Sequence, residues 1–179
     1  MKKYLPYIIL ITVSILFFWI SSRSYTLQAS ELESLELFRF FRGISNLIAF
    51  FVPLVLFVFY MLTSGLMFTL LDENFDSKKM AWIVSWSFIP VIFNCLIYLI
   101  VLYDIKIGGT LQEMLYHRSF LGLSLGDMEQ VSYIFWLGFY LFFAVLVRHD
   151  FGLSYGKAAL ITITPTLLVV IGRYFLHQI

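Results

Sequence analysis

Five long apolar stretches without charge fill most of this 179-residue chain, and they constrain its fold more than any other feature. A bilayer core about 30 Å thick is crossed by a helix of roughly 20 mainly apolar residues. Because lipid cannot satisfy exposed backbone groups, spans of this length must be helical. The sequence therefore predicts an all-α polytopic membrane protein, a bundle of five transmembrane helices within a single membrane domain (1–179), near residues 4–22, 44–71, 80–103, 130–148 and 157–176.

Composition supports this class and limits the partners. Hydrophobic residues make up 61% of the chain and charged residues 13%, against roughly 45–50% and 25% in an ordinary soluble domain. The net charge of +1 provides no basic field that would attract nucleic acid. We therefore expect the lipid bilayer as a partner and no nucleic acid.

The N-terminus and the distribution of basic residues predict the topology. Lys2 and Lys3 precede an apolar run, as in a signal peptide, but the run is long and no A-x-A-like site follows, so we expect an uncleaved first helix. Arginines and lysines divide equally between the two sides, but five of the six lysines fall on the side of the N-terminus. The positive-inside rule then favours a cell (inner) membrane protein with a cytoplasmic N-terminus and an external C-terminus.

The middle of every predicted span lacks Asp, Glu, Lys, Arg and His. A charge there costs roughly 2.5–3.5 kcal/mol, and membrane proteins keep one mainly for transport, proton relay or catalysis. We therefore expect no catalytic residues, no cofactor and no metal site. Asn94 is the best remaining candidate for an interhelical hydrogen bond.

Three prolines fall within spans and should bend them: Pro53, Pro90 and Pro165. Each has two interpretations, a static kink or a hinge that lines a path. Tryptophans near the span ends, Trp136 among them, suit the aromatic belts at the membrane interfaces.

Residues 152–156 read Gly-Leu-Ser-Tyr-Gly and match the G-x-S-x-G pattern of serine hydrolases. That chemistry needs a strand-to-helix turn and a histidine held by an acid, and no strand is predicted here. In the alternative, Ser154 caps the last helix and Gly152 permits a tight turn before it. We favour the structural interpretation.

The connections on the outer side carry helix signals of their own. Ser30 and Glu33 form a capping box ahead of an amphipathic segment, 31–42, with Gly43 offering a break after it. This segment is predicted either to lie in the outer interface or to extend the second span. Thr110 and Glu113 predict a second short helix, followed by an apolar loop over 120–126 that we expect to pack on its own helices.

Two segments resemble the Yip1 domain family of membrane proteins. Residues 76–90 read DSKKMAWIVSWSFIP, similar to the family's polar loop leading into a span with small residues before a proline. The span from Phe135 to Val147, followed by GLSYGKA over 152–158, resembles the family's final hairpin, with a Gly-Leu-Ser turn and Lys157 opening the last helix. The family's usual glycine-rich run before the third span is replaced here by DENFD over 72–76.

The resemblance implies five membrane helices, a cytosolic N-terminus and no catalytic residues. Eukaryotic relatives act in vesicle trafficking, and some prokaryotic relatives serve as accessories to membrane transport complexes. The Met-Lys-Lys start and the short loops suggest a bacterial member.

Two functions follow as hypotheses. The first is a non-enzymatic accessory or scaffold that packs against another membrane protein, for example an ABC-type exporter. The second is a small permease or lipid-handling protein with an interhelical cavity near Asn94 and Pro90. Helix-packing or partner contacts are expected at Asn94, Pro90, Trp136, Gly152, Ser154 and Lys157.

Overall fold

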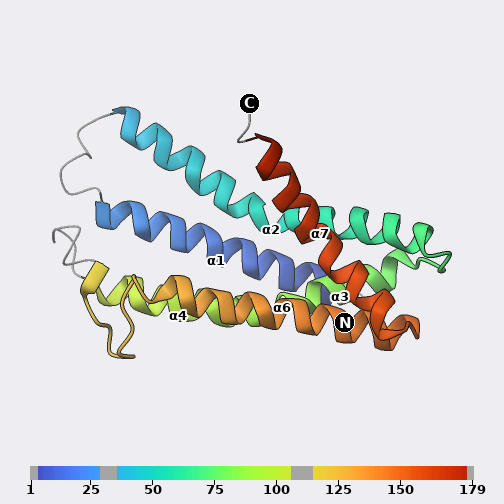
Figure 1. Cartoon of the computed structure of the whole chain (residues 1–179). Helices are drawn as coiled ribbons and strands as arrows, with labels where there is room; N and C mark the ends of the chain where they lie inside the picture. Colours follow the sequence, from blue (N-terminus) through green and yellow to red (C-terminus); the bar gives the residue numbers. More distant parts are fainter. Residues whose placement is uncertain (1–3, 29–35, 106–114, 177–179) are drawn as a thin grey trace.

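The computed structural model describes residues 4–28, 36–105 and 115–176, and this part of the chain is all-helical, without strands (Figure 1). In chain order the helices are α1 (Leu5–Gln28), α2 (Glu36–Leu70), α3 (Ser77–Ser87), α4 (Ile89–Asp104), α6 (Met128–Phe151) and α7 (Tyr155–Leu176). Four spans in the described residues are long and apolar enough to cross a bilayer, namely α1, α2, α3 with α4, and α6, and α7 adds a shorter apolar stretch. The predicted fold class, an all-α polytopic membrane protein, is confirmed.

The bundle has two ends, which we name by the chain. The N-terminal end holds the start of α1 and the α2–α3 and α6–α7 connections, and the opposite end holds the α1–α2 and α4–α6 connections (Figure 1). Helix α1 packs against α2, α3 and α4, and α6 packs against α3, α4 and α7. Helix α7 runs obliquely across α2 and then diverges from it (Figure 1).

The core is aromatic and lies where α2, α3, α6 and α7 meet. Phe68, Phe88, Phe139 and Phe143 are fully buried. The Tyr60 ring lies edge-on to Phe139 and Phe143, with centroid distances of 5.1 and 5.4 Å. Since lipid tails are as apolar as these side chains, close packing rather than water exclusion holds such helices together.

The third span, predicted as one helix, is broken in two at Phe88. The N–H of Phe88 donates to the Ser85 carbonyl (3.1 Å), a tightened turn, and α4 starts afresh at Ile89. Pro90 therefore occupies the first turn of α4, where its missing N–H removes no helical bond. Phe88 is fully buried and its ring contacts Phe139 at 5.1 Å, which anchors the break inside the core.

The predicted break at Gly43 is absent, because α2 runs without interruption through 35 residues from Glu36. Residues 36–42 of the predicted amphipathic segment therefore extend the second span rather than forming a separate interfacial helix, and residues 31–35 lie outside the described residues. Pro53 and Pro165 lie inside continuous helices. Most of the predicted short helix after Thr110 also falls outside the described residues.

Candidate functional site

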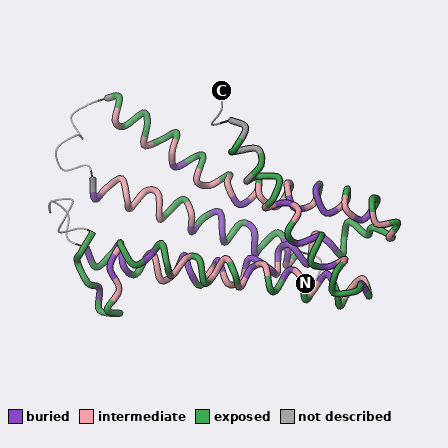
Figure 2. Tube along the Cα trace, in the orientation of Figure 1, coloured by how far each residue is buried: buried purple, intermediate pink, exposed green. Residues whose placement is uncertain are grey.

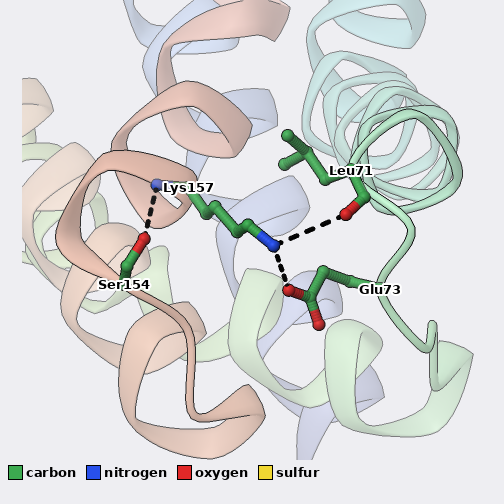
Figure 3. Close-up of polar contacts among 4 residues, drawn as sticks. All are labelled: Leu71, Glu73, Ser154 and Lys157. Atoms are coloured by element: carbon green, nitrogen blue, oxygen red, sulfur yellow. Dashed lines mark hydrogen bonds and ion pairs between the residues drawn. The ribbon is translucent and has the colours of Figure 1, made fainter.

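At the N-terminal end, Ser154 and Lys157 at the start of α7 meet Leu71 and Glu73 of the α2–α3 connection, and we call these four residues the Lys157 cluster (Figure 3). The Lys157 ammonium forms an ion pair with Glu73 and donates to the Leu71 carbonyl at 3.5 Å. Both charged side chains are about one-third exposed, 39% for Lys157 and 31% for Glu73. The cluster thereby ties the end of α2 to the start of α7.

Local sequence builds the α6–α7 turn. Gly152 ends α6 in the left-handed conformation (φ 66°), which glycine adopts without steric cost. The Ser154 hydroxyl then accepts the backbone N–H of Lys157 at 3.4 Å and so caps α7, as predicted. Asp76 likewise caps α3, its carboxylate accepting the N–H groups of Lys78 (2.9 Å) and Lys79 (3.2 Å).

Other charged side chains at this end contact an aromatic ring or an oppositely charged neighbour. The Arg148 guanidinium lies 3.7 Å from the centroid of the Tyr155 ring. His149 Nδ1 contacts the Asp150 carboxylate at 2.8 Å, with the histidine side chain 83% exposed. In the described part of the chain no three His, Cys, Asp or Glu side chains converge as metal ligands would.

Two of the other sequence-predicted residues, Asn94 and Pro90, lie at the interface of α4 with α6. Asn94 is 8% exposed, and its amide nitrogen donates to the Ser132 hydroxyl at 3.1 Å, a bond between α4 and α6. Pro90 packs against Gly138, where an added Cβ would lie 3.2 Å from the proline ring. Trp136 packs edge-on against the core residue Phe139 at 5.5 Å, so it contributes to the core.

The six predicted residues thus form two groups that do not meet in one site. Gly152, Ser154 and Lys157 share the α6–α7 turn, whereas Asn94, Pro90 and Trp136 lie along helix contacts. The residues that sequence reasoning missed are Glu73, Ser132 and Gly138. Only Gly138 left a signal in the sequence, as an isolated glycine inside an apolar span, which is typical of close helix packing.

A second polar region lies at the opposite end and joins α1 to α2 and α4. Arg23 donates from Nε and Nη2 to the carbonyls of Leu102 and Ile105, each at 3.3 Å, and so satisfies the end of α4. Between α1 and α2, the Ser21 hydroxyl donates to Asn46 at 2.8 Å, and the hydroxyls of Tyr25 and Ser45 bond at 2.7 Å.

The loop before α6 folds back on itself and on the bundle. Leu125 packs against a small buried cluster that includes Leu102 and Ile105, whereas Phe120 remains exposed. Ser124 donates its N–H (2.9 Å) and its hydroxyl (2.7 Å) to the Asp127 carboxylate. These hydrogen bonds, with a smaller contribution from Arg118, lower the pKa of Asp127 below its ordinary value.

The described helices form two hollows that open on the sides of the bundle. One, of about 370 Å³, lies between α6 and α7. The other, of about 630 Å³, lies between α1, α2 and α3 near the N-terminal end, and we call it the α1–α3 groove. Its walls combine aromatic and apolar side chains with one lysine, and include Tyr4, Tyr7, Phe57, Met61, Lys78, Ala81 and Trp82.

Comparison of the chain with protein-family models, with curated proteins and with solved structures finds no match.

Proposed function

We propose that this integral membrane protein is a non-enzymatic accessory or scaffold subunit of a membrane transport or trafficking complex, with the Yip1-like character that its sequence suggests. In this proposal it lies in the cell (inner) membrane with its N-terminus in the cytoplasm. Its partner is another membrane protein, for which an ABC-type exporter is one candidate.

The observation that carries this proposal is the exposed apolar face along the first half of α2 and the end of α7; α1 covers only the other side of α2 there, through hydrogen bonds to Ser45 and Asn46. Helix α2 has 35 residues, about 50 Å, and Asn46 is the only buried side chain among the described side chains of residues 37–51. In α7, every described side chain after Thr166 is exposed. We call these segments, α2 residues 37–51 and α7 residues 167–176, the diverging halves (Figure 2).

Most of the exposed side chains of the diverging halves are large and apolar, with Arg39 an exception, and α2 has several aromatic residues there. They include Leu37, Phe40, Phe41, Ile44, Leu47, Ile48, Phe51, Leu167, Leu168, Val169 and Ile171. Because α7 leaves α2 at this point, a helix of a partner could enter between them and contact both (Figure 1). Aromatic side chains are enriched where proteins contact one another.

A permease with a cavity near Asn94 and Pro90 has less support. The Asn94 amide is engaged with Ser132, and the Pro90 ring is in close contact with Gly138. Both residues therefore contribute to packing between α4 and α6, where a conducting path would need space.

Site-specific photo-crosslinking in native membranes tests the accessory role. A benzophenone amino acid replaces Phe51 on α2, which is 46% exposed, and in a matched control it replaces Phe142 on α6, which is 47% exposed. We expect one discrete crosslinked protein from position 51 and none from position 142. Because the two positions are equally exposed and of the same residue type, a difference between them reports a partner rather than lipid exposure.

Two results would contradict the accessory role. Equal crosslinking to lipid alone at both positions would mean that lipid covers the diverging halves. A product of twice the mass of the chain would mean that a second copy occupies them.

A further inference from the structure

The α1–α3 groove combines an apolar wall with a cation at its rim. The starts of α1 and α3 meet α2 here, and the lining residues Phe57, Met61 and Ala81 are apolar and half-buried. The volume of about 630 Å³ falls within the range of ligand sites, roughly 300–1,000 Å³.

The cation is Lys78, and no described residue forms an ion pair with it. Glu73, an acid of the neighbouring connection, is held by Lys157. The Asp76 carboxylate accepts backbone N–H groups at the start of α3. Lys79, the next residue, lies 6.0 Å from the Phe151 ring centroid and is not among the lining residues of the groove. The two lysines thus have different surroundings on one helical turn.

The groove lies near one end of the apolar spans, at the level expected for lipid headgroups. Lys78 lies in the first turn of α3, just before the apolar part of the third span begins, and Tyr4, Tyr7 and Trp82 lie beside it. Tyrosine and tryptophan rings favour the level of the lipid headgroups, and a lysine at this depth extends its ammonium toward phosphate groups. An occupant of this groove has to be anionic at the rim and apolar below it.

We propose that the α1–α3 groove binds one anionic phospholipid, whose phosphate pairs with Lys78 and whose acyl chain lies along Phe57, Met61 and Ala81. An anionic headgroup supplies the negatively charged partner that Lys78 does not have among the described residues. A hydrocarbon tail matches the apolar wall. This inference does not rest on the accessory role, because the groove and the diverging halves are formed by different residues.

Brominated lipids test this proposal, because bromine on an acyl chain quenches nearby tryptophan fluorescence and Trp82 lines the groove. The full chain is placed in phosphatidylcholine nanodiscs with a minority of phosphatidylglycerol, and the bromine is carried either by the phosphatidylglycerol or by an equal amount of phosphatidylcholine. We expect stronger quenching by the brominated anionic lipid. Because the Trp86 ring lies 5.1 Å from that of Trp82 and is quenched with it, Trp82→Phe should reduce this difference and the double variant Trp82→Phe/Trp86→Phe should abolish it, which assigns it to this end of the bundle.

Two lysine variants separate a site from diffuse attraction to the membrane surface. Lys78→Gln removes the proposed phosphate contact and should reduce the preference for phosphatidylglycerol about tenfold, as expected for a hydrogen bond between charged groups. Lys79→Gln removes the same charge one residue away and should leave the preference nearly unchanged. Both side chains are exposed, so neither variant should alter the melting temperature.

A third variant, Ala81→Leu, fills the groove while it retains both lysines and should also abolish the preference. Equal effects of the two lysine variants would overturn the proposal in favour of diffuse surface attraction. An unchanged preference in Lys78→Gln would overturn it as well. If crosslinking captured a second copy of the chain through the groove, the occupant would be a protein and the lipid proposal would be wrong.

Discussion

At the scale of single residues, polar side chains satisfy helix ends and connect neighbouring helices near both ends of the bundle. Lys157 with Glu73 connects α7 to the end of α2, and Arg23 satisfies the last carbonyls of α4. Partly exposed ion pairs contribute about 0–1 kcal/mol each, so these contacts specify position more than they stabilise. Between the two ends of the bundle, the aromatic core supplies the close packing of the helices.

Asp127 predicts a pH dependence in the loop before α6. Its folded-state pKa lies below the ordinary value of 3.8 because Ser124 donates two hydrogen bonds to the carboxylate. The stabilisation is therefore complete above the unfolded-state pKa and is lost as the pH falls through the lower folded-state pKa. We expect amide exchange in residues 119–127, corrected for its intrinsic pH dependence, to stay protected at neutral pH and to accelerate only below about pH 4.

Asp127→Asn should weaken this protection already at neutral pH and remove the acidic transition. Asp150→Asn, a control at the N-terminal end, should leave both unchanged. Loss of protection in the unmodified chain near neutral pH would contradict the assignment to a carboxylate of lowered pKa.

At the scale of elements, the break between α3 and α4 is held on both sides. Phe88 is buried against Phe139, and the Pro90 ring packs onto Gly138 of α6. Because the break is closely packed on both sides, the structure favours a static kink, one of the two interpretations that the sequence allowed. A hinge would need space around the proline ring that Gly138 and its helix occupy.

Gly138→Ala should destabilise the protein relative to Gly65→Ala by about 1–3 kcal/mol, the usual range for overpacking. Both glycines lie inside helices and gain the same helix propensity on substitution. A Cβ at position 138 would lie 3.2 Å from the proline ring, whereas one at position 65 would make an ordinary contact of 3.5 Å with Phe75. Unfolding in mixed micelles, followed by circular dichroism, measures the difference. Equal free energies of unfolding would mean that the chain around Pro90 shifts to accommodate the added methyl group at no cost.

At the scale of the whole molecule, the helices share a core near the N-terminal end, and toward the opposite end α7 separates from α2 while α1 stays bonded to α2 and α4. The buried aromatic residues belong to the core that α2, α3, α6 and α7 share, and α2 and α7 diverge beyond it (Figure 1). This asymmetry gives the proposed partner and the proposed lipid separate places. In these two proposals the partner contacts the diverging halves, and the lipid enters the groove at the N-terminal end.

Cysteine labelling tests the proposed orientation in the membrane. The only native cysteine, Cys95, is buried and is replaced by alanine. A cysteine at Phe120, 76% exposed near the opposite end, should react with a membrane-impermeant maleimide in intact cells. One at His149, whose side chain is 83% exposed at the N-terminal end, should react only after permeabilisation. The reverse pattern would place the N-terminus outside.

Much of the fold could be predicted from the sequence because lipid imposes a simple rule on it. Apolar runs of sufficient length must form helices, and this placed the helices to within a few residues, except where α1 continues to Gln28, α2 begins at Glu36 and the third span breaks at Phe88. A local rule also sufficed for the cap at Ser154, since a short polar side chain before a helix accepts its free N–H groups.

Tertiary structure alone decided which helices meet and what remains uncovered. The pairing of Lys157 with Glu73 joins residues 84 positions apart, and that of Asn94 with Ser132 spans 38. The contact of Pro90 with Gly138 and the α1–α3 groove likewise depend on helices distant in the chain. In uniformly apolar spans every face of a helix suits lipid equally well, so hydrophobicity does not decide which helices pack together. Shape complementarity between their side chains decides it.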